Sequence, residues 1–221
     1  MAIVFVAGGH NGTANTGTAL TVTATITAND TAVVITEVAA TSAVVSVVDT
    51  GGSVYSKQAS ISNGTFTMEI WSTAVGAAKA STSVTITYGT THVARGAAVG
   101  DYSGVVALGI TNTASGSASP ATVSLTTQDA NNFVVAGLGT SSATTQTFTA
   151  QNGSIRETTT LAGSNGTLVD NTAASPSSVT DSATYSVAGN WAAVALELRS
   201  TSGGGGSVIP AQSYPVCLRM G

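Results

Sequence analysis

Charged residues are scarce in this chain. Of its 221 residues, six are Lys or Arg and ten are Asp or Glu, which is 7% of the chain and a net charge of −4. Roughly 25% is usual for soluble proteins. Because six scattered cations build no basic patch, we expect no nucleic-acid partner. Disorder combines low hydrophobicity with high charge, whereas 43% of these residues are hydrophobic. We therefore expect a folded protein.

The chain is also poor in residues that catalyse reactions or bind metals. It has one cysteine, Cys217, and two distant histidines, His10 and His92, so an internal disulfide is impossible and zinc-ligand spacing is missing. The motifs of serine hydrolases, P-loop proteins, zinc proteases and EF-hand calcium loops are absent as well. We expect a protein that is not an enzyme and that needs no cofactor or metal.

Two carboxylates stand within apolar stretches, Glu69 in MEIW and Glu197 in ALELR. Strand alternation places Glu69 on one face with Trp71, and Glu197 on one face with Arg199. We interpret both as exposed strand carboxylates, each paired with a nearby cation. The alternative, a glycosidase pair, needs two facing carboxylates beside an aromatic platform.

Long apolar runs are missing too. Every such run is broken by Thr, Ser or Gly well short of the roughly 20 residues that cross a bilayer, so we expect no membrane partner. The start, MAIVFVAGGHNGT, has no basic region and too short an apolar stretch for a secretory signal. These features would fit a protein that is made in a host cytoplasm and leaves the cell by lysis. We therefore expect it on the exterior surface of a virion.

What the chain does have is alternation with a period of two in Thr- and Val-rich segments, which indicates β-strands. In ALTVTATIT, residues 19–27, apolar residues alternate with threonines, and Asn63-Gly64 predicts a hairpin between two further strands. Turn residues recur at short intervals, as in β-sandwiches. The sequence therefore predicts an all-β domain over residues 1–200, an antiparallel sandwich of two sheets around one core.

Five stretches in this order resemble a family of β-sandwich domains of tailed-bacteriophage virion proteins and some bacterial surface proteins. They are MAIVFVAG, MEIWSTAV, VGDYSGV, SPATVSLTTQDANNFVVAGLG and WAAVALELR. The resemblance covers about residues 1–200, and its motifs mark the fold and carry no catalytic residue. It implies a jelly-roll-like sandwich within an assembly, of the capsid decoration (cement) or fibre type.

The remaining residues lie outside that resemblance. Residues 201–207, rich in Gly and Ser, predict a free hinge, and residues 208–221 predict an extended arm, because two prolines forbid a regular helix. Two alternatives stay open: the arm folds back on its own sandwich, or it adds to a neighbouring subunit at a poorly guarded sheet edge, which we favour. The expected assembly contacts are its apolar residues and prolines: Val208, Ile209, Pro210, Tyr214, Pro215, Val216, Leu218 and Met220.

Together these features predict a capsid decoration protein that bridges and stabilises neighbouring coat subunits. Its expected partners are the major capsid protein or other virion proteins, and further copies of itself as a homo-oligomer. One alternative is a receptor- or glycan-binding module of a tail or head fibre, with host surface glycans as partners. The other is a subunit of a bacterial surface filament or adhesin.

Overall fold

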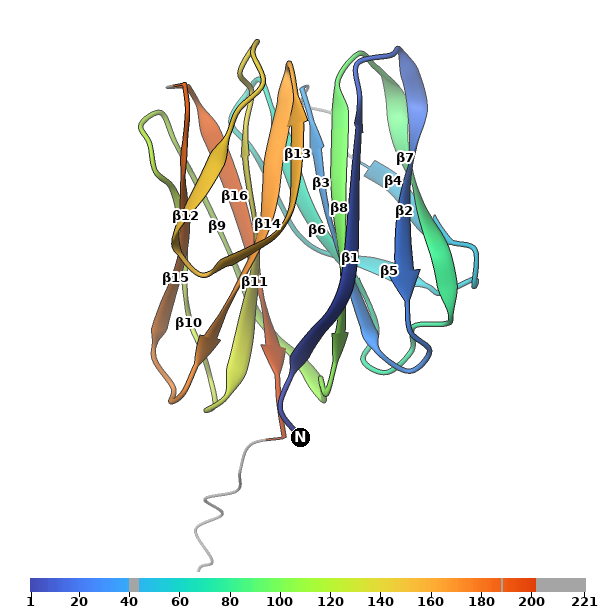
Figure 1. Ribbon diagram of the computed structural model, residues 1–221, viewed down its shortest axis with the longest axis vertical. Coiled ribbons are helices and arrows are strands. Elements are labelled where there is room, and N and C mark those ends of the chain that lie inside the picture. The colour runs from blue at the N-terminus through green and yellow to red at the C-terminus, as the bar shows by residue number, and fades with distance from the viewer. Residues whose placement is uncertain (40–43, 188, 202–221) are drawn as a thin grey trace, which may run out of the picture.

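The computed structural model describes residues 1–39, 44–187 and 189–201, and these residues form sixteen β-strands and no helix (Figure 1). The strands are β1 (Val4–Thr13), β2 (Gly17–Ile26), β3 (Thr31–Val38), β4 (Val44–Asp49), β5 (Tyr55–Ser62), β6 (Thr67–Thr73), β7 (Ser81–His92), β8 (Arg95–Ser103), β9 (Ala107–Gly116), β10 (Ala121–Thr126), β11 (Asn132–Thr140), β12 (Phe148–Asn152), β13 (Ser154–Leu161), β14 (Ser164–Ala173), β15 (Ser178–Tyr185) and β16 (Trp191–Arg199). All pairings between them are antiparallel, which confirms the all-β antiparallel prediction.

The described strands form four sheets instead of the predicted two. In the first half of the chain, β2-β7-β4 is an outer sheet and β1-β8-β3-β6-β5 an inner one. In the second half, β13-β14-β11-β16-β9 is the inner sheet and β10-β15-β12 the outer one. Figure 1 shows the two halves side by side. Each half is thus a jelly-roll-like sandwich, and the inner sheets pack against each other in the middle of the molecule.

The second half repeats the strand order of the first. Adding eight to each strand number of the first half gives the order of the second, for the inner and the outer sheet alike. The turn into the third strand of each half contains a non-glycine residue with positive φ, Asn29 at 70° and Asn131 at 60°. The extra sheets therefore come from a structural duplication. Strand patterns did not reveal it, because they do not show which strands share a sheet.

The two halves meet as the subunits of a two-fold dimer do. Strand β1 lies against β13 and β5 against β9, while β8 lies against β14 and β6 against β16. In the repeat, β9 is the counterpart of β1, and β13 is the counterpart of β5. The contact of β1 with β13 is therefore equivalent to that of β9 with β5, and the contact of β8 with β14 is equivalent to that of β16 with β6. Such a self-complementary interface is typical of homodimers, and here one chain provides both sides.

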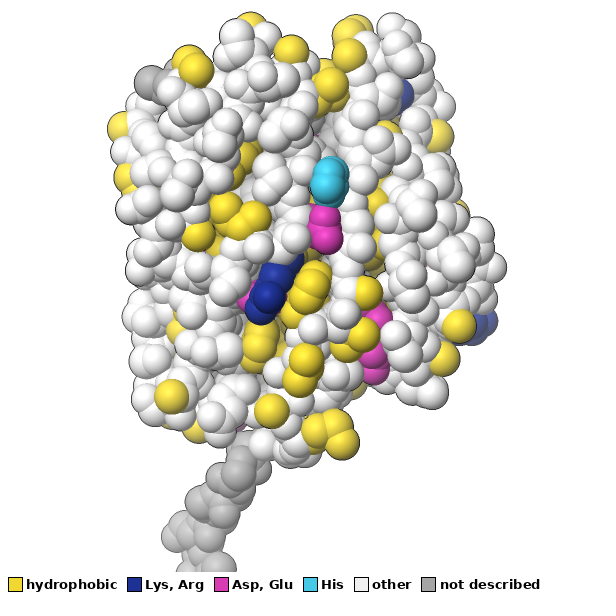
Figure 2. All heavy atoms as spheres, viewed as in Figure 1, with side chains coloured by type: hydrophobic (Ala, Val, Ile, Leu, Met, Phe, Trp, Pro, Cys, Tyr) yellow, Lys and Arg dark blue, Asp and Glu magenta, His cyan; other side chains and the backbone are white. Residues whose placement is uncertain are grey.

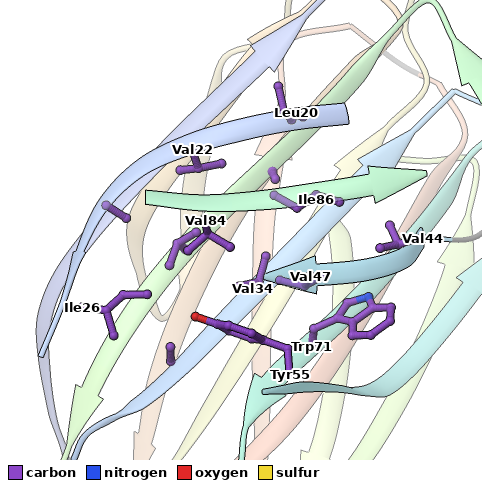
Figure 3. Close-up of a cluster of buried hydrophobic side chains, with 14 of the residues drawn as sticks. Leu20, Val22, Ile26, Val34, Val44, Val47, Tyr55, Trp71, Val84 and Ile86 are labelled. Atoms are coloured by element: carbon purple, nitrogen blue, oxygen red, sulfur yellow. The ribbon is translucent and has the colours of Figure 1, made fainter. Parts of the chain in front are cut away.

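Three hydrophobic clusters fill the three spaces between the four sheets. Figure 3 shows the first cluster, between the outer and inner sheets of the first half, where Val22, Val84 and Ile86 face Val34 and Trp71. A second cluster fills the equivalent space in the second half. The third lies between the inner sheets, whose central strands are buried on both faces. Strands buried on both faces read as continuous apolar runs.

Glycines let the inner sheets approach each other. A Cβ atom on Gly137 would lie 2.9 Å from Ile35, and one on Gly139 would lie 2.8 Å from both Met68 and Phe66. These distances are too short for non-bonded carbon atoms. The large side chains of the first half therefore occupy the space that the missing side chains of β11 leave.

The outer sheets turn a hydroxyl-rich face to solvent. In β2, the predicted ALTVTATIT stretch alternates as expected from Leu20 to Ile26, with the apolar residues buried and the threonines exposed, whereas Ala19 at its start is exposed. Hydroxyls pair across strands, Thr21 with Thr85 at 3.0 Å and Ser124 with Thr180 at 2.8 Å. In Figure 2, which views the sheets from their edges, few Lys, Arg, Asp, Glu or His side chains reach the surface.

The predicted Asn63-Gly64 hairpin joins β5 to β6. Its loop is closed by the Asn63 amide, which donates to the carbonyl of Phe66 at 3.1 Å. Only Gly64 has positive φ, at 92°, whereas a type I′ turn needs two such residues in succession. The hairpin is therefore confirmed, but with a longer loop than that turn type forms.

Candidate functional site

Polar and charged side chains gather where the first strand of the chain meets the second half. The imidazole Nδ1 of His10, on β1, lies 2.7 Å from a carboxylate oxygen of Glu157, on β13. Figure 2 shows a histidine, an acidic and a basic side chain gathered on this face, over β1 and β13. We call the cluster of His10, Glu157, Arg156, Asp170 and Tyr102 the seam.

Below the surface, Asp170 of β14 collects two donors. The Arg156 Nε donates to its Oδ2 at 2.8 Å, and the Tyr102 hydroxyl donates to the same oxygen at 3.3 Å. The Arg156 guanidinium also lies 4.8 Å from the centre of the Phe5 ring. The hydrogen bond to Asp170 raises the pKa of Arg156, and burial raises that of Tyr102. Since Tyr102 and Phe5 belong to the first half, this network ties the two halves together.

Two buried carboxyls near the seam have no adequate counter-charge. Asp181 has no ion-pair partner among the described residues, and burial together with the charge of Asp170 raises its pKa to about 8, although a hydrogen bond with Asn171 acts to lower it. Glu37 on β3 is 2% exposed and points at β14 between the halves. It accepts the Thr159 hydroxyl, and burial raises its pKa to about 8. At neutral pH both groups therefore stay protonated.

The seam lacks the arrangement that acid–base chemistry requires. Asp170, Asp181 and Glu37 are buried, so a substrate does not reach them. The accessible pair, His10 and Glu157, has no hydroxyl or thiol bonded to the imidazole within the described residues. Covalent catalysis needs a nucleophile in hydrogen-bond reach of its base. Within those same residues, no group of three His, Cys, Asp or Glu is placed to hold a metal ion. The chemistry that the seam supports is attachment of one half to the other.

Sequence reasoning did not find the seam. The available signal was SIRETTTL, the stretch that becomes β13, where a cation and an anion adjoin in a chain with sixteen charged residues. The partner of Arg156, Asp170, lies 14 residues away along the chain, and the partner of Glu157, His10, lies 147 residues away. Only the folded topology brings these residues together.

The predicted exposure of Glu69 and Glu197 is wrong, because both are buried. Glu69 does pair with a cation, Lys57, at 2.7 Å, and it also accepts the Trp71 indole N–H. Glu197 is paired with no cation in the described structure. It accepts N–H groups from Ile110, Gln128 and Asn132.

Glu197 has a structural counterpart in the first half. It accepts the backbone N–H of Gln128, just after β10, while Asp101 on β8 accepts that of Thr27, just after β2. Both carboxylates thus bind the connection between the second and third strands of their own half. They are structural residues, which also argues against the glycosidase alternative.

The predicted assembly contacts, from Val208 to Met220, and the hinge after Thr201 lie outside the described residues. The described chain ends at the base of the molecule, where the Ser200 amide donates to Asn132 Oδ1 at 3.1 Å. The Thr201 hydroxyl contacts the Met1 carbonyl at 3.5 Å. The described chain therefore ends beside the N-terminus.

An uncharged depression opens at the same base and has a cavity volume of about 330 Å³. Ala2 and Ile3 line it from the N-terminus, Asn131 and Phe133 from the start of β11, and residues 172–174 from the end of β14. We call it the base pocket. Its lining offers an apolar surface and a few neutral polar groups, without an acid, a base or a charge.

Comparisons with protein-family models, with curated proteins and with solved structures found no match. Within the described residues, none of the secondary structure is a helix long and apolar enough to cross a membrane.

Proposed function

We propose that this chain is a non-enzymatic structural protein of a bacteriophage particle, a capsid decoration protein that bridges neighbouring coat subunits. Support comes from how its few charges are used. Four ion pairs hold strands or connections of the fold together, at Lys57–Glu69, His10–Glu157, Arg156–Asp170 and Arg199–Asp129. The outer faces are left uncharged, which suits attachment by apolar area and neutral hydrogen bonds.

The observation that carries the proposal is an apolar patch on the outer sheet of the first half. Val45 and Val48 on β4 are 61% and 49% exposed, and Val54 is 78% exposed. Val48 and Val54 are antiparallel bridge partners, so their side chains adjoin. Single exposed apolar residues are ordinary, and adjoining ones on an otherwise hydroxyl-rich face support the proposal of a contact surface. Strand β4 is also the last strand of its sheet, and its outer side pairs with the chain only at the Val48–Val54 bridge among the described residues.

The test is retention of the protein on its particles. Particles carrying the protein are washed in salt from about 0.05 M to 1 M, and the bound protein is measured by quantitative mass spectrometry. Contacts held by apolar area resist screening, whereas exposed ion pairs weaken within this range. We expect no loss up to 1 M salt. Release by salt alone would contradict the apolar bridge.

A matched pair of variants locates the contact. The double variant V48D/V54D places two charges on the patch, and we expect at least a tenfold loss of particle affinity, about 1.4 kcal/mol. The control V93D changes a valine that is 64% exposed elsewhere on the surface, and it is expected to bind as the parent does. Equal binding of all three proteins would refute the patch. Saturable binding of the parent to host glycans, without particle binding, would favour the fibre-module alternative.

A further inference from the structure

The base pocket lies next to Ser200 and Thr201, after which the C-terminal segment, residues 202–221, follows in the sequence. The Ser200 hydroxyl donates to the Ala130 carbonyl at 3.3 Å, and the Ser200 amide donates to the Asn132 side chain. Ser200, the first residue after β16, is thus bonded to both chain neighbours of Asn131, which lines the pocket. Thr201 contacts Met1, whose neighbour Ala2 also lines the pocket. The described chain therefore ends at the rim of the pocket.

The length and composition of that segment match the pocket. Residues 202–207 can span about 20 Å when extended, which is ample to bring the next residues to an adjacent site. Those residues are Val208, Ile209 and Pro210, the first apolar group after the glycines. The pocket, at about 330 Å³, stands at the small end of ligand pockets and suits two or three aliphatic side chains.

The chemistry of the lining agrees with this occupant. Ile3, Phe133 and Ala173 provide the apolar wall, and the exposed side chains of Asn131 and Thr172 at the rim are able to hydrogen-bond an extended backbone. An uncharged peptide suits the site, whereas a charged ligand would find no counter-ion among the lining residues. A segment tethered this close also has an effective concentration in the millimolar range, so a weak contact suffices to keep it bound.

We propose that in the free protein the base pocket binds the chain's own C-terminal segment, with Val208, Ile209 and Pro210 as its anchors. The bound segment keeps its apolar residues out of water until assembly offers them a neighbouring subunit. This intrachain contact does not depend on the proposed function, since it concerns the free chain.

The test uses NMR of the full chain with labelled isoleucine methyl groups. We expect a nuclear Overhauser contact between the methyl groups of Ile209 and Ile3, and an Ile209 methyl signal shifted by the Phe133 ring. Both are expected to be the same at 20 μM and at 500 μM protein, because the contact lies within one chain. An Ile209 methyl group at its unstructured shift, without the contact, would overturn the proposal. So would a contact that grows with concentration.

Two neighbouring substitutions provide the control. Ala174, on the rim of the pocket, and Ser175, which does not line it, are both exposed, so neither change should disturb folding. A174D places a carboxylate at the mouth of the pocket and is expected to abolish the Ile209–Ile3 contact. S175D carries the same charge one residue away and is expected to retain it. If A174D keeps the contact unchanged, the segment binds elsewhere. Particle binding is measured separately, so the two proposals fail independently.

Discussion

Substituting glutamine for Glu37 is expected to stabilise the protein at neutral pH. One carboxyl oxygen accepts the Thr159 hydroxyl, and the other has no partner among the described residues. Burial raises the pKa of Glu37 from 4.5 to about 8. The folded chain therefore keeps this proton between about pH 4.5 and pH 8, where the unfolded chain releases it. A group that binds its proton more tightly in the folded state makes stability fall as the pH rises through this window.

The magnitude follows from the distance between the two pKa values. At pH 7, which is about 2.5 pH units above the ordinary pKa, keeping the proton costs the folded state about 3 kcal/mol, at about 1.4 kcal/mol per unit. Glutamine has nearly the same shape and does not ionise. The gain of E37Q over the parent is therefore expected to grow by about 1.4 kcal/mol for each pH unit between about pH 5 and pH 8.

The assay is urea denaturation of parent and variant at several pH values, followed by tryptophan fluorescence. The diagnostic is how the difference in unfolding free energy between E37Q and the parent changes with pH. A lost hydrogen bond would instead shift that difference by the same amount at every pH. A difference that stays constant from pH 5 to pH 8 would refute the reasoning. Asp181 acts in the same direction, so D181N should remove a further part of the pH dependence that E37Q leaves.

Glu69 is the matched control for this substitution. It is as deeply buried as Glu37, but Lys57 and the Trp71 indole hold its two oxygens at 2.7 and 2.9 Å. E69Q leaves the Lys57 charge without its partner, so we expect a loss of about 1–3 kcal/mol. The same chemical change thus has opposite signs at two buried glutamates. If E69Q stabilised the protein as E37Q does, burial alone would explain both results, and the argument that the partners of Glu69 decide the sign would be wrong.

Two further substitutions test the backbone requirements of the duplicated fold. G137A inserts a methyl group against Ile35 between the halves and is expected to cost about 1–3 kcal/mol in urea denaturation, whereas G189A, where a Cβ meets nothing within 4 Å, should be neutral. If G137A and G189A lost the same unfolding free energy, the close approach of the two halves at Gly137 would not be required for stability. N131A is expected to lower stability by about 1 kcal/mol, since Asn131 has φ 60°, while N131G at the same position should not. Equal melting temperatures of N131A and N131G would contradict a strained turn.

Local strand structure was largely predictable from the sequence. Alternation identified β2, and the Asn63-Gly64 pair identified the β5–β6 hairpin. Strands β1, β9 and β13 are edge strands of the inner sheets. Edge strands are partly exposed on both faces, and their burial patterns show no clean alternation. Their sequences therefore lack the period-two signal on which strand prediction depends.

The larger organisation was less accessible. The duplication leaves little trace in the residues themselves, because the two halves use different side chains for one task, as Asp101 and Glu197 do. The burial of Glu69 could not be read from MEIW, since it depends on an inner sheet covered on both faces. The seam depends on pairs of residues far apart in the chain. The composition did indicate the uncharged outer faces correctly, because hydroxyl residues so outnumber charged ones.

We propose that this protein holds neighbouring subunits of a particle together, partly through its C-terminal segment. The most direct measurement compares the full chain with a chain that ends at Thr201, adding each to particles stripped of the protein and counting bound copies by electron microscopy. The shorter chain retains all sixteen strands, so its circular dichroism should match that of the full chain. We predict that the full chain decorates the particles and the shorter one does not. Complete decoration by the shorter chain would contradict the account.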